Sequence, residues 1–195
     1  MGQPVEIFVP QTNAVREIYL RGNIPFPYWS QAWPASLALS EFLLLHKEYI
    51  QQKKVIELGA GLGLPSIIAA SYAHSVLCSD YISEAVGIAS QSAAHNGLNN
   101  FTAQVLDWHS LPHNLSADVL LLSDINYDPA IFSVQQQLIN HFIKTGTIVI
   151  LSTPQRLMAK EFVAPLMSFC KQQEEISVSH HGNVMRITIL ALGKK

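Results

Sequence analysis

Short apolar runs alternate with longer stretches of helical periodicity through the middle of the chain. The apolar runs are typical of strands buried on both faces, and they lie at 55–58, 75–79, 101–106, 118–123 and 147–151. The stretches with helical spacing of apolar residues lie at 34–50, 64–73, 82–96, 129–144 and 156–170. Strands that alternate with helices form a parallel sheet with right-handed crossovers. The pattern therefore predicts an α/β fold with a doubly wound, mostly parallel sheet.

Segments at both ends of the chain complete the predicted fold. Residues 5–9 and 15–20 alternate weakly and predict two short strands. Residues 24–34 are rich in proline and aromatic residues, which favours an irregular segment that packs over a ligand site or simply caps the core. Near the C-terminus, strands at about 174–180 and 184–192 flank a short turn and predict a hairpin. We expect a Rossmann-like, seven-stranded sheet whose C-terminal hairpin adds one antiparallel strand.

Composition and charge narrow the class of protein. Of the 195 residues, 49% are hydrophobic and 13% are charged, which indicates one packed domain. The net charge is −2 and basic residues form no run, so we expect no nucleic-acid partner. No apolar run approaches the ~18 residues of a membrane span, and no signal-peptide pattern is present, so a soluble, cytoplasmic protein is expected. Its cysteines, Cys78 and Cys170, are then expected to be reduced.

A glycine-rich turn follows the first of these apolar runs. Residues 55–65 read Val-Ile-Glu-Leu-Gly-Ala-Gly-Leu-Gly-Leu-Pro, with glycines at 59, 61 and 63. Glycine permits a sharp turn and close approach of a ligand to the backbone, and the helix that begins there offers unpaired N–H groups. The dinucleotide fingerprint G-x-G-x-x-G requires glycine where this chain has Leu64. The spacing disfavours an NAD(P) oxidoreductase and resembles motif I of the class I methyltransferases that use S-adenosylmethionine (SAM).

Acidic residues follow four successive predicted strands: Glu57, Asp80, Asp107 and Asp124. Ligands of such sheets bind beyond the carboxyl ends of the strands. Asp80 lies 21 residues after Gly59, at the distance where an acid accepts hydrogen bonds from ribose hydroxyls. We expect Asp107 to accept from an adenine amino group beside the indole of Trp108. Glu57 is expected to hold the turn or the cationic end of SAM, and Asp124 lies nearest the entering acceptor.

Several motifs together resemble one family, the seven-β-strand protein-lysine methyltransferases (methyltransferase family 16), which carry D-x-x-Y after strand four. The motifs are Trp33-Pro34-Ala35-Ser36, Glu57 to Pro65, Asp80-Tyr81, Leu106-Asp107-Trp108 and Asp124 to Pro129. The resemblance covers residues 33–152. It implies that SAM is the cofactor, bound by Trp33, Gly59, Asp80 and Trp108. It further implies that Asp124 and Tyr127 position the acceptor amine. The other glycines of the turn, Gly61 and Gly63, are also expected to bind the cofactor.

The length and the aromatic segment predict the organisation of the whole chain. Residues 1–195 would form one domain, in which residues 1–32 lie over the site and residues 33–195 are the catalytic core. A lysine amine is about 0.1% neutral at pH 7.4. A carboxylate such as Asp124 would therefore bind the ammonium, and an aromatic rim would desolvate it as its proton leaves.

Other readings of the site stay open at this point. The acceptor is a protein lysine or a small amine, and a non-catalytic SAM-binding module is a third possibility. His109 or His113, near the active-site edge, is a candidate base or a solvated loop residue. His180 and His181 lie at a turn without a cluster of cysteine or carboxylate ligands, so no metal is expected.

Overall fold

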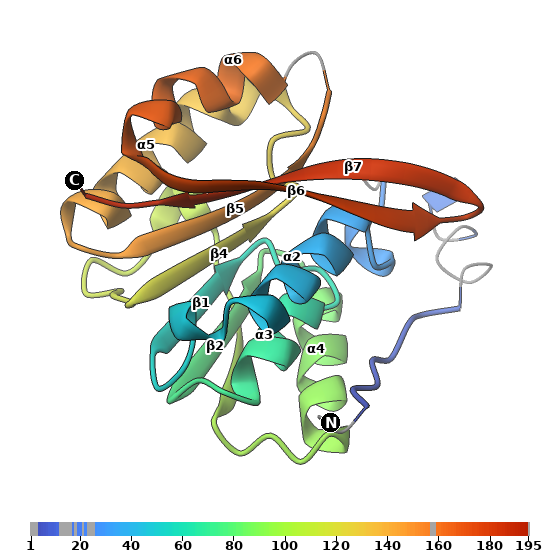
Figure 1. Cartoon of the computed structure of the whole chain (residues 1–195). Coiled ribbons are helices and arrows are strands. Elements are labelled where there is room, and N and C mark those ends of the chain that lie inside the picture. The colour runs from blue at the N-terminus through green and yellow to red at the C-terminus, as the bar shows by residue number, and fades with distance from the viewer. Residues whose placement is uncertain are drawn as a thin grey trace.

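The computed structural model describes residues 4–11, 17, 19–20, 22, 26–156 and 159–194. Within these residues, seven strands form one sheet with helices on both of its faces (Figure 1). The strands are β1 Lys54–Leu58, β2 Ser75–Asp80, β3 Phe101–Val105, β4 Val119–Ser123, β5 Ile148–Pro154, β6 Cys170–His180 and β7 Asn183–Leu192. The α-helices are α2 Pro34–Leu45, α3 Leu64–Ala70, α4 Ser83–His95, α5 Phe132–Lys144 and α6 Ala159–Val163. Short 3-10 helices span Tyr28–Ser30, Lys47–Tyr49, Trp108–Ser110, Pro129–Ile131 and Ala164–Phe169.

The order of strands across the sheet is β3-β2-β1-β4-β5-β7-β6. Strands β1 to β5 are parallel, and β7 is antiparallel to both of its neighbours, β5 and β6. The predicted doubly wound sheet with an antiparallel strand from the C-terminal hairpin is therefore confirmed. The chain reverses its direction of winding between β1 and β4, which is where sheets of this kind bind ligands.

The core has two layers, one on each face of the sheet, and β4 shows why. Leu121 packs with α2 and α3, while Leu120 and Leu122 pack with α5 and α6. Because alternate residues of a strand point to opposite faces, a strand covered on both faces must be apolar throughout. Complete burial of each leucine contributes roughly 1.5–3 kcal/mol. The apolar run at 118–123 thus identifies a central strand.

The N-terminal segment differs from its prediction. Residues 5–9 form no strand; they are held by side chains of α4 instead. The backbone N–H of Phe8 donates to Ser92 Oγ at 2.9 Å, and Glu6 Oε2 lies 2.6 Å from His95 Nε2. Of the strand expected at 15–20, residues 17, 19 and 20 are helical, and the others lie outside the described residues.

The C-terminal hairpin is longer than predicted. Its turn, His181-Gly182, has positive φ at both residues (49° and 78°), as a two-residue type I′ turn requires. Strand β5 ends at Pro154 opposite Ile187, whereas β6 and β7 continue to pair from Ser177↔Arg186 out to the turn. The hairpin therefore projects past the carboxyl edge of the parallel strands (Figure 1).

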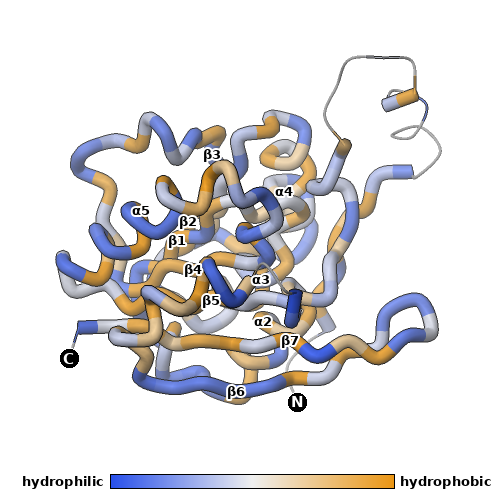
Figure 2. The backbone as a smooth tube through the Cα atoms, turned by 90° about the horizontal axis from the view of Figure 1, so that it is seen from above, coloured by the Kyte–Doolittle hydropathy of each residue, from blue (hydrophilic) through white to orange (hydrophobic). Residues whose placement is uncertain are grey.

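The first half of β6, residues 170–175, forms a polar edge to the sheet. Figure 2 shows this stretch as mostly hydrophilic, and its residues include Lys171, Gln173 and Glu175. Charged and polar residues on an outermost strand discourage pairing with other chains.

Among the described residues, no helix is long and apolar enough to cross a membrane. The helix expected at 156–170 consists of α6 and the following 3-10 helix, with residues 157–158 outside the described part.

Candidate active site

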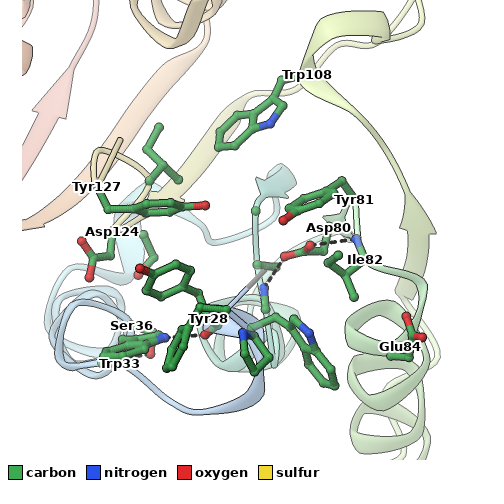
Figure 3. Close-up of a pocket in the computed structure, with 18 of the residues that line it drawn as sticks. Tyr28, Trp33, Ser36, Asp80, Tyr81, Ile82, Glu84, Trp108, Asp124 and Tyr127 are labelled. Carbon is green, nitrogen blue, oxygen red and sulfur yellow. Dashed lines mark hydrogen bonds between the residues drawn. The ribbon is translucent and has the colours of Figure 1, made fainter. Parts of the chain in front are cut away.

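A cavity of about 370 Å³ opens beyond the carboxyl ends of β1, β2 and β4 (Figure 3). Its wall combines the glycine turn, the end of β2, Trp108, the segment after β4 and the Pro- and aromatic-rich segment before α2. Arg156, just after β5, completes the wall. The cavity thus lies at the switch point of the sheet, and the aromatic segment of the N-terminal region covers it.

The glycines of the turn serve different purposes, although all have positive φ (68°, 53° and 72° at Gly59, Gly61 and Gly63). Gly59 and Gly61 line the cavity. A Cβ on Gly63 would instead lie 2.9 Å from Cys78 Sγ and 3.1 Å from Ala89 Cβ. Gly63, expected among the cofactor-binding residues, is therefore a packing position that lets α3 approach β2 and α4.

Asp80 presents its carboxylate to the cavity from the end of β2. Its Oδ2 accepts a hydrogen bond from the backbone N–H of Gly61 at 2.8 Å, and Oδ1 accepts from Ile82 N–H at 3.0 Å. Burial raises the pKa of Asp80, while these backbone donors act in the opposite direction. Each carboxylate oxygen can accept a further hydrogen bond. Asp80 is thus fixed in place and still able to accept from ligand hydroxyls.

Glu57 lies beneath the glycine turn, away from the cavity wall. Its Oε2 accepts hydrogen bonds from the backbone N–H (2.9 Å) and the hydroxyl of Ser66, in the first turn of α3. Its side chain is fully buried, and this burial raises the pKa of Glu57 to about 8. Of the two roles expected for Glu57, the geometry therefore fits support of the turn and not contact with SAM.

Asp107 also lies off the cavity wall, unlike its neighbour Trp108. Its Oδ1 accepts from the backbone N–H of His109 at 2.9 Å and lies 2.8 Å from the ring Nδ1. These hydrogen bonds lower the pKa of Asp107, whose side chain is about half exposed (54%). Asp107 therefore caps a 3-10 helix, and neither His109 nor His113 lines the cavity. The indole of Trp108 stands over Gly59, with its Cη2 3.5 Å from where a Cβ would be.

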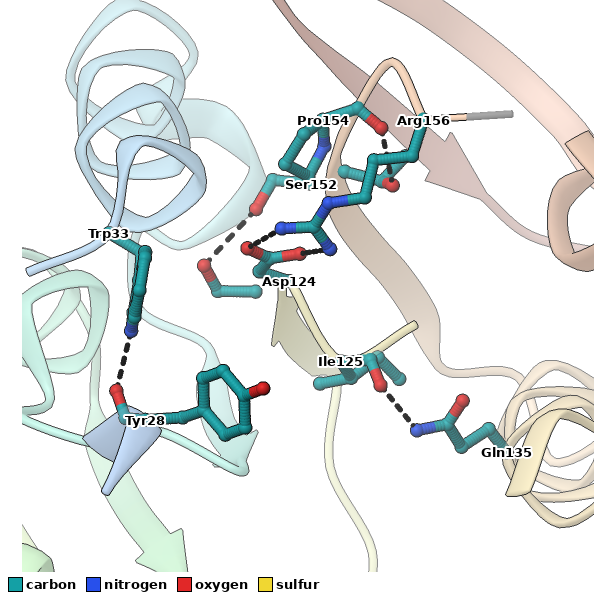
Figure 4. A network of polar contacts seen from close by, with 10 residues as sticks. Tyr28, Trp33, Asp124, Ile125, Gln135, Ser152, Pro154 and Arg156 are labelled. Carbon is teal, nitrogen blue, oxygen red and sulfur yellow. Dashed lines mark hydrogen bonds and ion pairs between the residues drawn. The ribbon is translucent and has the colours of Figure 1, made fainter. Parts of the chain in front are cut away.

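The opposite end of the cavity is formed by Asp124, Tyr127 and Arg156. Arg156 Nη1 donates to Asp124 Oδ1 at 2.8 Å and Nη2 donates to Oδ2 at 3.0 Å (Figure 4). Burial raises the pKa of Asp124, and the Arg156 guanidinium opposes that rise. Asp124 has φ of +51°, a left-handed conformation that costs a non-glycine residue about 1–3 kcal/mol. Such strain, held in place by its surroundings, is typical of functional sites.

Sequence reasoning missed Arg156, because it belongs to no motif. What could have identified Arg156 is that β4 and β5 are neighbours in the sheet. Ser123 pairs with Ser152, and the backbone N–H of Asp124 donates to Ser152 O at 2.9 Å, so the residues that follow both strands converge. Helix capping after β4 is performed by Asp128, whose Oδ1 accepts from Ala130 N–H at 3.0 Å. Asp124 is thus available to the cavity.

Aromatic rings close this end of the cavity from the N-terminal side. The ring centroids of Tyr28 and Tyr127 are 5.0 Å apart, and those of Tyr28 and Phe26 are 4.8 Å apart. Trp33, also on the cavity wall, donates its indole N–H to the backbone oxygen of Tyr28. Burial raises the pKa of Tyr127 to about 12, so its phenol keeps its proton at neutral pH. No group of three or more His, Cys, Asp or Glu side chains in the described residues is placed to hold a metal ion.

The strand order and the glycine turn at the end of β1 define the fold of the class I SAM-dependent methyltransferases. The fold is similar to that of a putative RNA methyltransferase from Pyrococcus horikoshii (TM-score 0.68, 17% identity, covering 88% of this chain and 90% of that one). It is also similar to magnesium protoporphyrin IX methyltransferase from Synechocystis with bound SAM (TM-score 0.62, 18% identity, covering 93% and 92%). At these identities the comparison establishes the fold alone.

Sequence comparison adds the family. The model described as "Lysine methyltransferase" matches residues 29–169, and the chain belongs to this family. The mouse electron transfer flavoprotein beta subunit lysine methyltransferase is 32% identical over 135 residues, covering 67% of this chain and 51% of that protein. Mouse histone-arginine methyltransferase METTL23 is 30% identical over 131 residues, covering 64% and 52%. The chain thus spans about half the length of these relatives.

Proposed function

We propose that the chain is a SAM-dependent methyltransferase whose acceptor is a side-chain amine of a protein, most simply lysine. One observation carries the proposal: Asp80 and Asp124 stand at opposite ends of a single cavity roofed by aromatic rings. The first carboxylate suits a ribose and the second suits a cationic acceptor. A scaffold module that had lost its acceptor site would not need the second end.

The residues at the first end fit SAM. Gly59 and Gly61 leave the backbone open to the cavity, Asp80 offers acceptors for hydroxyls, and the Trp108 indole offers a flat apolar face. The cavity wall carries three acidic side chains (Asp80, Glu84 and Asp124) against Arg156, a balance that favours cationic ligands. When bound, SAM supplies an activated methyl group on a positively charged sulfur.

The chain's own residues then have three tasks. Asp124 draws the acceptor ammonium into the cavity, and the rings of Tyr28 and Tyr127 exclude water around it. Only about 0.1% of a lysine amine is neutral at pH 7.4, so the ammonium must first give a proton to water or to the Asp124 carboxylate, and desolvation between these rings favours that loss. The neutral amine would then form the new N–C bond as the C–S bond of SAM breaks, which leaves S-adenosylhomocysteine. Tyr127, with its pKa raised to about 12, keeps its proton and is not a base, and its phenol oxygen can accept a hydrogen bond from the ammonium.

Incubation of the protein with methyl-labelled SAM and a lysate of its host tests the proposal. We expect the label in protein, and mass spectrometry of the labelled peptide identifies the modified residue. Relatives named for lysine and for arginine acceptors make the residue type the first result to read. Label confined to small molecules would replace the protein acceptor by a small amine. Absence of SAM binding in calorimetry would reject the function altogether.

A further inference from the structure

Of the described residues that line the cavity, Arg156 is the only basic one, and its contact is with Asp124. The guanidinium spans both carboxylate oxygens, at 2.8 and 3.0 Å. Two parallel N–H···O bonds fix the plane of a carboxylate as well as its charge, which a lysine cannot do. The pair therefore defines the orientation of Asp124 in the acceptor end.

The backbone that follows β4 and the backbone that follows β5 bring Asp124 and Arg156 together. Strands β4 and β5 are neighbours, and Asp124 N–H donates to Ser152 O at 2.9 Å. Beyond β5, Arg156 N–H donates to Pro154 O at 2.8 Å, which turns the chain back toward β4. Asp124 itself occupies a left-handed conformation that is unfavourable for a residue with a side chain. Two adjacent strand ends are thus shaped to bring one carboxylate and one guanidinium together.

We propose that Arg156 is a positioning residue for the acceptor, holding the Asp124 carboxylate in one orientation and leaving one lone pair on each oxygen for the acceptor's N–H groups. The inference rests on the proposed function, because it assigns Asp124 to the acceptor. A carboxylate has about four acceptor positions in all, and bidentate pairing uses two of them.

Arg156 also opposes the uptake of a proton by Asp124. Besides Arg156, the titratable groups that line the cavity with Asp124 are Tyr28, Asp80, Tyr81, Glu84 and Tyr127. None of these supplies a positive charge. Burial acts to raise the pKa of Asp124, and only Arg156 opposes it. Without the guanidinium, the carboxyl group would take up a proton at a higher pH and lose its attraction for an ammonium.

The competing arrangement is a lock, in which Arg156 stands in the place of the acceptor's cation and must be displaced. Two variants separate these roles. Arg156→Gln keeps a hydrogen-bond donor and removes the charge. Arg156→Lys keeps the charge and loses the two parallel hydrogen bonds of the guanidinium. Arg186→Gln, an exposed arginine on β7, is the matched control.

With the labelled acceptor, we expect Arg156→Gln to lower kcat/KM tenfold or more at pH 7 and to leave SAM affinity within twofold. The acidic limb of its kcat/KM profile should move to higher pH by about one unit or more. Arg156→Lys should restore the position of that limb while recovering only part of the rate, and Arg186→Gln should match the wild type. A lower acceptor KM or a higher kcat/KM in Arg156→Gln would establish the lock and overturn the positioning role.

A measurement without any acceptor keeps this inference separate from the proposed function. In protein labelled with ¹³C at aspartate carboxyls, Asp124→Asn identifies the Asp124 signal, and titration gives its pKa. We expect a higher pKa of Asp124 in Arg156→Gln than in the wild type; an unchanged pKa would overturn the inference even in an active enzyme. Conversely, a wild-type protein that methylates no acceptor overturns the proposed function and the acceptor role of Arg156 together, whatever the titration gives.

Discussion

The two ends of the cavity are built in different ways. The cofactor end consists of residues close in sequence, and its key contacts join a side chain to the backbone, as between Asp80 and Gly61. The acceptor end joins separate segments of the chain, and its key contacts join side chains, as between Tyr28 and Tyr127 or Asp124 and Arg156. A backbone contact tolerates many neighbouring sequences, whereas a side-chain pair is lost with either partner. The acceptor end is therefore where relatives of one fold can diverge.

The strongest test of this division is the loss of Asp124. Asp124→Asn should lower methyl transfer roughly a hundredfold or more, if one placed charge supplies about 3 kcal/mol of transition-state binding. SAM affinity should stay within twofold, because Asp80 and the glycine turn are untouched. Turnover and calorimetry on one preparation check both halves of the expectation. Asp128→Asn, which alters a helix cap off the cavity wall, is the control. Parallel loss of SAM binding and turnover would show that the two ends are not separable.

The converse change acts at the cofactor end. Asp80→Ala removes an acceptor for ligand hydroxyls, and SAM affinity should fall by about 1.5–3 kcal/mol, roughly ten- to a hundredfold. Asp107→Ala should change SAM affinity less than twofold, since Asp107 faces His109 outside the cavity. Calorimetric titration with SAM compares the two. A larger effect from Asp107 than from Asp80 would return Asp107 to the cofactor site.

Beneath the cofactor end, Glu57 should make stability depend on pH. Its pKa is about 8 in the folded chain against 4.5 for a free side chain, so the folded state holds the proton more tightly. Stability from this group is then complete below pH 4.5 and is lost as the pH rises through about 8. The free energy of unfolding should be about 2 kcal/mol lower at pH 8 than at pH 6. Urea unfolding across this range measures it, and Glu57→Gln should flatten the dependence. Equal slopes in both proteins would contradict the role given to burial.

A smaller effect distinguishes packing from ligand contact within the glycine turn. Gly63→Ala should destabilise the chain by about 1–3 kcal/mol, because the new Cβ meets Cys78 Sγ and the backbone is left-handed. Gly97→Ala carries the same backbone strain with open space around it, and should cost about 1 kcal/mol. Melting temperatures of the two variants give the difference. Equal losses would mean that the contact with Cys78 is relieved at little cost.

The sheet could be predicted from the sequence because its central strands are apolar on both faces. The helices show a helical periodicity of apolar residues, and proline or glycine residues mark several of their ends. The sequence also placed Asp80 and Trp108 on the cavity, since a local motif fixes both. It failed where the outcome depends on a distant partner. Weak alternation at 5–9 suggested a strand, but the segment lies along α4, where Ser92 and the residue just after the helix, Asn96, accept its backbone hydrogen bonds. An acid at a strand end has the same pattern whether it faces the cavity like Asp80 or solvent like Asp107.

Arg156 is a functional residue that local sequence could not identify, because its partner is distant in the chain. Nothing in its local sequence distinguishes it from a solvated surface arginine. Only the pairing of β4 with β5 makes it a neighbour of Asp124. The identity of an acceptor-end residue thus follows from the order of strands in the sheet, and that order had to be known first.

The position of Cys78 beneath Gly63 has a consequence for chemical labelling. Cys78 is buried in β2, and burial raises the pKa of its thiol, whereas Cys170 at the start of β6 is partly exposed. The thiolate is the form that attacks alkylating reagents, so Cys78 is protected for as long as it stays buried beneath the glycine turn. The two thiols thereby become reporters: we expect Cys170 to be modified in the folded state, whereas the rate at which Cys78 is modified should measure how often the cofactor end opens.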